Sequence, residues 1–129
     1  PMPKNILSRV VSCCDTGMMI LDDVPAFYYG TSPNKFFDYI SSGLPVLNNY
    51  PGWLADLINK HHCGIALPPR NPKAFADALC LLADDPVLRR EYGKNARLLA
   101  EEKFSRDRLA NEFVDWLEAV YAKSGDKVT

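Results

Sequence analysis

The sequence predicts a doubly wound α/β fold of Rossmann-like character, a small parallel sheet with helices on its faces. Short apolar runs at residues 18–21, 46–47 and 65–67 are the main signal. Helical patterns separate these runs, and this combination is typical of parallel strands buried on both faces. The expected order is helix, strand, helix, strand, helix, strand and then three helices, which is half of a doubly wound fold.

Apolar spacing and capping residues predict where the helices lie. Residues 4–13 place their apolar side chains on one side of a helix. We expect Ser32 to cap the next helix, because its hydroxyl can accept a hydrogen bond from an unpaired backbone N–H of the first turn. We expect Pro33 to be the first helical residue, because an N–H at that position has no partner in the helix and proline has no N–H to leave unpaired. Residues 51–60 connect the second and third strands. The last three helices are expected to begin at residues 72, 86 and 105.

The last of these helices carries the longest apolar stripe. Its members are spaced at i, i+4, i+7, i+8 and i+11, as expected for one face of a helix that packs against other protein. They are Leu109, Phe113, Trp116, Leu117 and Val120. We interpret residues 1–122 as one partial domain, because the chain begins in mid-fold, and residues 123–129 as a tail.

Composition limits the function classes. The 129 residues include 15 basic and 16 acidic side chains, and this balance argues against broad nucleic-acid binding. No apolar run approaches the roughly 20 residues of a membrane span, and no signal peptide is recognised at residues 1–12. The four cysteines form no C-x-x-C pair, which favours reduced thiols and a cytoplasmic location.

The segment from residue 32 to residue 46 is the strongest functional signal. The helix start places free N–H groups, Asn34 and the ammonium of Lys35 near one point, which predicts an anion site that suits phosphate. Lys35, Asp38 and Ser42 share one helix face. A cation near the helix start and a carboxylate one turn later suit a ligand with a diphosphate and a hydroxylated ring, such as a nucleotide sugar.

Several motifs in order are similar to one enzyme family. Residues 37–46 (FDYISSGLPV) look like a Leu-Glu-Ala-Met-Ala-x-Gly-x-Pro-Val motif, and residues 51–58 stand where Gly-Gly-x-x-Glu-Leu-Ile is expected. From about Cys13 to Tyr121 the chain resembles the C-terminal, donor-binding half of retaining GT-B-fold glycosyltransferases, the "group 1" family that builds bacterial surface polysaccharides. Its Ser-Pro-Asn-Lys variant is typical of a subgroup in polysaccharide, lipopolysaccharide and lipid-linked glycan synthesis.

The resemblance implies roles for matching residues. Asp38 corresponds to the second of two family glutamates and would hold the ribose hydroxyls. The first glutamate would fall at Gly30, where no carboxylate stands. The resemblance and the helix-start chemistry together assign the donor diphosphate to Thr31, Ser32, Asn34 and Lys35, and assign possible cleft lining to Tyr28, Tyr29 and Gly30.

The resemblance also implies partners. The family's basic pair and its acceptor lobe would lie upstream of residue 1, so we expect no catalytic residue in this chain and no activity from it alone. No cofactor and no metal are implied. The expected donor is a UDP-sugar, with GDP-sugars second. The location would be cytoplasmic, with peripheral contact of the full-length protein at the inner face of the cell membrane. An unpaired strand edge at residues 18–21 predicts that the fragment self-associates there or through the preceding helix.

Three alternatives remain open at this stage. The chain could be a noncatalytic α/β module that binds a nucleotide or another anion. It could be an assembly domain with a vestigial cleft. It could also be a complete small α/β domain rather than a fragment.

Overall fold

The computed structural model describes residues 2–125, with side chains as far as Lys123. It contains a parallel sheet of three strands in the order β1-β2-β3. The strands are β1 (Gly17–Met19), β2 (Val46–Asn48) and β3 (Gly64–Ala66). Gly17 lies opposite Val46, which in turn lies opposite Gly64. The predicted α/β class and the parallel sheet are therefore confirmed.

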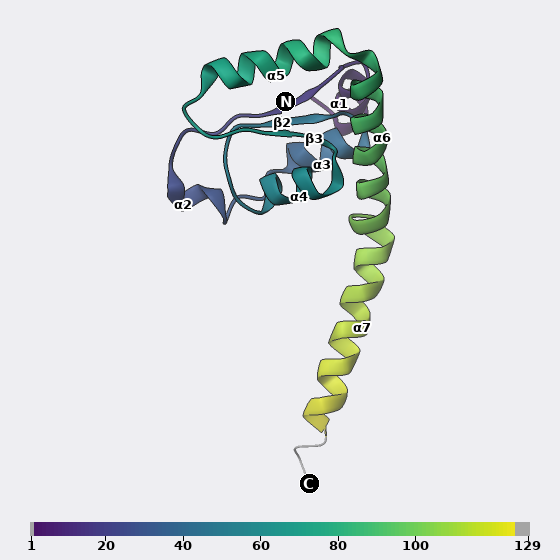
Figure 1. Cartoon of the computed structure of the whole chain (residues 1–129). Coiled ribbons are helices and arrows are strands. Elements are labelled where there is room, and N and C mark those ends of the chain that lie inside the picture. The colour runs from purple at the N-terminus through teal and green to yellow at the C-terminus, as the bar shows by residue number, and fades with distance from the viewer. Residues whose placement is uncertain (1, 126–129) are drawn as a thin grey trace.

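The helices connect and flank these strands (Figure 1). One helix precedes β1, a short helix follows it, and five more helices lie along the rest of the described chain. They are α1 (Lys4–Val11), α2 (Pro25–Tyr28), α3 (Asn34–Ser41), α4 (Trp53–His61), α5 (Pro72–Asp84), α6 (Pro86–Lys103) and α7 (Arg106–Gly125). The short helix α2 has no counterpart in the sequence prediction.

The two faces of β2 pack on different helices. Val46 belongs to a core cluster with α3, α4 and α6, whereas Leu47 packs with Ala78 and Leu82 of α5. All three residues of β2 are buried, while β1 alternates between buried and exposed. The central strand is thus covered on both faces, and Figure 1 shows α5 on one side of the sheet with α3 and α4 on the other.

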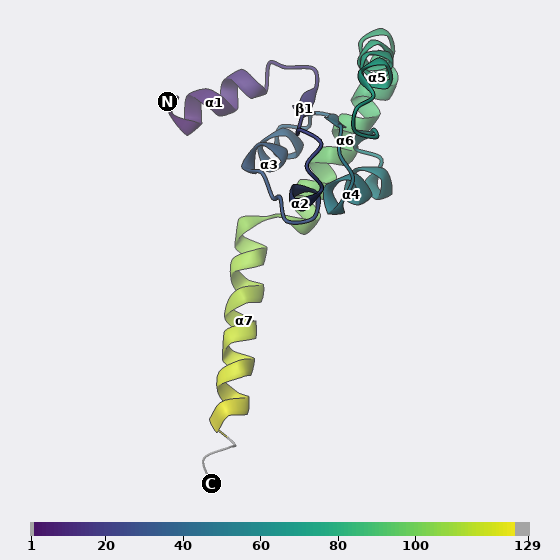
Figure 2. The same cartoon turned by 90° about the vertical axis from the view of Figure 1, so that its left-hand side faces the viewer.

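Two helices project from this body (Figure 2). No residue of α1 is buried, and every described side chain of α7 is exposed. The apolar stripe predicted for the last helix therefore exists, yet nothing in the described chain covers it. The helix α7 runs through Gly125, three residues into the predicted tail segment, and residues 126–129 lie outside the described residues.

The predicted start of α3 is wrong by one residue. Pro33 has an extended backbone, with φ −75° and ψ 131°, and it is the capping position, while no side chain caps the helix. The physical reason is that proline fixes φ but leaves ψ free. Ser32 therefore precedes the helix, and Asn34 is the first helical residue.

Candidate functional site at the carboxyl edge of the sheet

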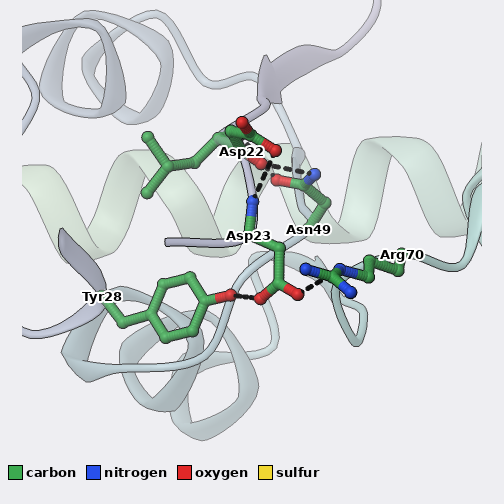
Figure 3. A network of polar contacts seen from close by, with 6 residues as sticks. Asp22, Asp23, Tyr28, Asn49 and Arg70 are labelled. Carbon is green, nitrogen blue, oxygen red and sulfur yellow. Dashed lines mark hydrogen bonds and ion pairs between the residues drawn. The ribbon is translucent and has the colours of Figure 1, made fainter. Parts of the chain in front are cut away.

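The loops that follow the strands meet at one edge of the sheet and are joined by polar contacts (Figure 3). The Asn49 side chain, after β2, accepts from the Leu21 N–H at 2.8 Å and donates to the Leu21 carbonyl at 3.0 Å. The Asp23 carboxylate accepts from the Tyr28 hydroxyl and pairs with Nε of Arg70, which follows β3. Ligands of open α/β sheets bind at this carboxyl edge. The network therefore fixes the loops from which a site there would be built.

This network stabilises structure and supplies no reactive group. The hydrogen bond to Asp23 raises the pKa of Tyr28 to about 12, so the phenol stays protonated at neutral pH. Asp23 is already engaged by both partners, and its side chain is mostly buried. Arg70 has a left-handed backbone, with φ 55°, and its exposed side chain is held by Asp23. Tyr28 thus lines the inside of the loop and is not open to a ligand.

The amino end of α3 lies at the same edge, because this helix leads from β1 back to a parallel neighbour. Trp53, the first residue of α4, donates from Nε1 to the Thr31 carbonyl at 3.0 Å. That bond ties the segment before α3 to the loop after β2. The side chains of Ser32, Asn34 and Lys35 are exposed, and the helix has no side-chain cap. An anion can therefore approach the first N–H groups of this eight-residue helix.

The neighbouring residues are partly committed to the fold. Thr31 donates from its N–H and its hydroxyl to the Phe27 carbonyl, so its hydroxyl oxygen keeps only acceptor capacity. Tyr29 is exposed by 74%, and a Cβ at Gly30 would meet no atom within 4 Å. These residues surround an open surface rather than a closed cleft.

Asp38 is half-buried and lines two adjacent hollows of about 470 and 280 Å³ between α3 and its neighbours. Lys4 of α1 lines both hollows, whereas Lys35 lines neither. The larger hollow also contains Arg97 and Arg106. A carboxylate among amide, hydroxyl and cationic groups suits a hydroxylated anion. Because Lys35 lines neither hollow, contact of both Asp38 and Lys35 with one ligand stays a prediction.

Sequence reasoning missed the residues that organise this edge. Asn49 and Arg70 each follow a predicted strand, and that position was the signal that could have found them. The interaction of Asp23 with Tyr28 had no local signal, because it depends on the turn made by α2. Lys4, Arg97 and Arg106 reach the Asp38 hollow only through tertiary packing.

Comparison with protein-family models, with curated proteins and with solved structures gives no match for this chain. Within residues 2–125, no helix is long and apolar enough to cross a membrane. The same described part of the chain holds no group of three or more His, Cys, Asp or Glu side chains placed to bind a metal ion. The geometry of the carboxyl edge is therefore the basis for a functional proposal.

Proposed function

We propose that this chain is the donor-binding part of a retaining glycosyltransferase and binds a nucleotide sugar, with a UDP-sugar favoured over a GDP-sugar. The exposed, uncapped amino end of α3 beside Lys35, at the carboxyl edge of a parallel sheet, is the observation that supports this most. The diphosphate would lie against Thr31, Ser32, Asn34 and Lys35, and the ribose hydroxyls would donate to Asp38.

The chemistry of such a site is electrostatic. In sugar transfer the bond to the diphosphate breaks, and negative charge grows on the departing group. Fixed N–H groups and an ammonium stabilise that charge without having to reorganise. In this proposal the acceptor lobe of the same enzyme supplies the remaining catalytic groups, and the product is a bacterial surface polysaccharide, lipopolysaccharide or lipid-linked glycan made at the cytoplasmic face of the membrane.

A second candidate is a noncatalytic module that binds a nucleotide or another anion. The observation that favours it concerns Gly30. This residue stands where the family that the sequence resembles has its first glutamate, and a Cβ built there would meet no atom within 4 Å. Without that carboxylate the site keeps its anion-binding groups but has fewer contacts that distinguish a sugar donor from a free nucleotide.

A thermal-shift panel of UDP, GDP, ADP, their sugars and inorganic diphosphate tests both candidates. A donor site predicts that a UDP-sugar raises the melting temperature at lower concentration than UDP or diphosphate does. Similar binding of all the anions favours the noncatalytic module. If no compound shifts the melting temperature, both candidates are wrong.

Variants then locate the binding. Lys35→Ala and Asp38→Ala should each weaken nucleotide-sugar binding by about 1–3 kcal/mol, because each removes a charged hydrogen-bonding partner. Lys94→Ala is the matched control, since it removes another exposed lysine, which lies on α6. Unchanged affinity in Asp38→Ala would leave Asp38 as a surface charge, and unchanged affinity in Lys35→Ala would exclude the amino end of α3.

A further inference from the structure

The larger hollow beside Asp38 contains charged groups that the fold does not use. Its volume of about 470 Å³ lies within the roughly 300–1,000 Å³ typical of small-molecule sites. Two of its charged side chains neutralise each other, since Nε of Arg97 lies 2.7 Å from Oε1 of Glu101. The remaining three are Asp38, Lys4 and Arg106, and no hydrogen bond or ion pair within the described part of the chain engages their side chains. These three groups are therefore available to a ligand.

The position of Arg106 in the hollow follows from the way α6 runs past α3 in the opposite direction. The turn at Gly43, after the end of α3, lies against the middle of α6. At the other end of the contact, the rings of Phe37 and Phe104 have centroids 5.1 Å apart. Arg106 follows two residues after Phe104, so it lines the hollow at the amino half of α3, as Asn34 does.

The unused groups differ along the hollow in charge and in hydrogen-bonding capacity. Asn34 and Asp38 are four residues apart, which is about 6 Å along the helix axis. Arg106 therefore provides a cationic end, and the carboxylate of Asp38 lies one helical turn away. Two unused cations against one carboxylate favour an anion. An ionised carboxylate only accepts hydrogen bonds, so the part of the ligand that contacts Asp38 must donate them.

We propose that this hollow binds a phosphate ester of a sugar. The phosphate pairs with the guanidinium of Arg106 at the Asn34 end, because a guanidinium matches the geometry of phosphate oxygens. The sugar hydroxyl groups donate to Asp38, one turn along α3. Lys4, which lines both hollows beside Asp38, supplies the second positive charge, and a phosphate monoester carries about −1.5 to −2 at pH 7.

The apolar part of the lining suits the rest of such a ligand. Small-molecule sites combine mostly apolar walls with a few polar groups that fix the orientation. Here the apolar side chains contact the carbon-bearing face of the sugar ring, between the phosphate and the hydroxyl groups. They are Phe37, Ile40, Ala100 and Phe104.

Two kinds of ligand share this chemistry. One is the ribose and phosphate part of a nucleotide sugar. In that case the inference rests on the proposed function, and it adds Lys4 and Arg106 to the donor site. The other is a free sugar phosphate, which needs neither a base nor a second lobe. In both cases the first residue of α7 becomes part of the ligand site.

Isothermal titration calorimetry of the whole chain tests the proposal with ribose 5-phosphate, inorganic phosphate, ribose, UDP and GDP. Ribose 5-phosphate should bind more tightly than inorganic phosphate or ribose, because only the phosphate ester contacts both Arg106 and Asp38. Arg106→Gln should weaken its binding at least about 10-fold, since this change removes a charged hydrogen-bond donor. Asp38→Ala should weaken ribose 5-phosphate binding and should not weaken the binding of inorganic phosphate.

Arg90→Gln is the matched control. Arg90 is an exposed arginine of α6 that does not line the hollow, so its replacement changes the net charge equally and leaves the proposed site intact. Circular dichroism verifies that each variant folds. Equal weakening in Arg90→Gln and Arg106→Gln would mean that only the overall charge of the surface attracts the anion, and it would overturn the proposal.

The nucleotide probes separate the two ligands from each other and from the proposed function. Tighter binding of UDP or GDP than of ribose 5-phosphate, with the same loss in Arg106→Gln, supports the hollow as part of a donor site. Binding of ribose 5-phosphate that depends on Arg106, without binding of either nucleotide, supports a free sugar phosphate and contradicts the donor-site proposal.

Two further outcomes overturn the inference about the hollow. One is nucleotide binding that is lost in Lys35→Ala and unchanged in Arg106→Gln, which would leave the proposed function intact. The other is that neither ribose 5-phosphate nor a nucleotide binds the chain.

Discussion

The helices α3 and α7 are both amphipathic, yet they relate to the fold in opposite ways. Phe36 and Ile40 of α3 are fully buried against the sheet and α6, whereas Phe113 and Trp116 of α7 are more than half exposed. An apolar stripe thus predicts a helix, and it predicts that the apolar face of this helix packs against other protein. It does not say whether that partner is the same domain or another surface, and this difference can be tested one residue at a time.

The largest expected difference is between two phenylalanines. Phe36→Ala should lower the free energy of unfolding by about 3–5 kcal/mol, because it opens a cavity in a closely packed core. Phe113→Ala should change it by less than about 0.5 kcal/mol, because the ring is on the surface of the monomer. Urea unfolding, at a concentration where the chain sediments as a monomer, measures both. A large loss in Phe113→Ala would mean that α7 packs on the body in solution.

The space around two glycines also differs between the packed body and the open edge of the sheet. A Cβ at Gly93 of α6 would lie 2.4 Å from the Gly43 carbonyl oxygen, so α6 can approach the turn after α3 only because residue 93 has no side chain. Gly93→Ala should cost towards the upper end of about 1–3 kcal/mol. Gly30→Ala meets open space and should be near neutral. If thermal denaturation shows equal effects, the close contact between α6 and Gly43 is not present in solution.

These contrasts show what the sequence could predict. The three strands, the parallel order and the helices were recognisable because each apolar run or stripe is local in the chain. The Pro-Asn-Lys start of α3 was found for the same reason, although its cap was misplaced because the sequence cannot give ψ at Pro33.

The residues that were missed depend on tertiary geometry. Asp23, Tyr28 and Arg70 come from two loops that follow different strands, and the sequence contains no signal that brings Arg70 to Asp23. The exposure of α7 was equally hidden, since its periodicity is the same whether the stripe is covered or not.

A pH titration compares a thiol inside the body with one on its surface. Burial raises the pKa of Cys63 to about 11, against an ordinary value of 9.0. The folded protein therefore retains a proton that the unfolded chain releases, so stability is complete below pH 9 and falls as the pH rises through 11. The loss is on the order of 3 kcal/mol.

The measurement is urea unfolding at pH 8, 9 and 10, below the range where Tyr28 contributes most. Cys63→Ala should flatten the decrease above pH 9, while Cys80→Ala, at an exposed thiol of α5, should leave it unchanged. A decrease that persists in Cys63→Ala would assign the effect to another group.

The smallest effects come from two ion pairs of nearly identical geometry. Arg97 and Glu101 of α6 are 2.7 Å apart, and Arg108 and Glu112 of α7 are 2.6 Å apart, both at i,i+4 on exposed surface. Glu101→Gln and Glu112→Gln should each lower the free energy of unfolding by about 0.2–0.5 kcal/mol, and by less at high salt.

The two substitutions should increase local opening in different parts of the structure. Arg97 also donates to the Ser41 carbonyl and so joins α6 to α3. Hydrogen exchange of monomeric protein should show faster opening of the body in Glu101→Gln. In Glu112→Gln it should show faster exchange in α7 and at its junction with α6 only, because Arg108 donates to the Glu102 carbonyl of α6 and every described side chain of α7 is exposed. Faster exchange of the body amides in Glu112→Gln would show that α7 is coupled to the fold after all.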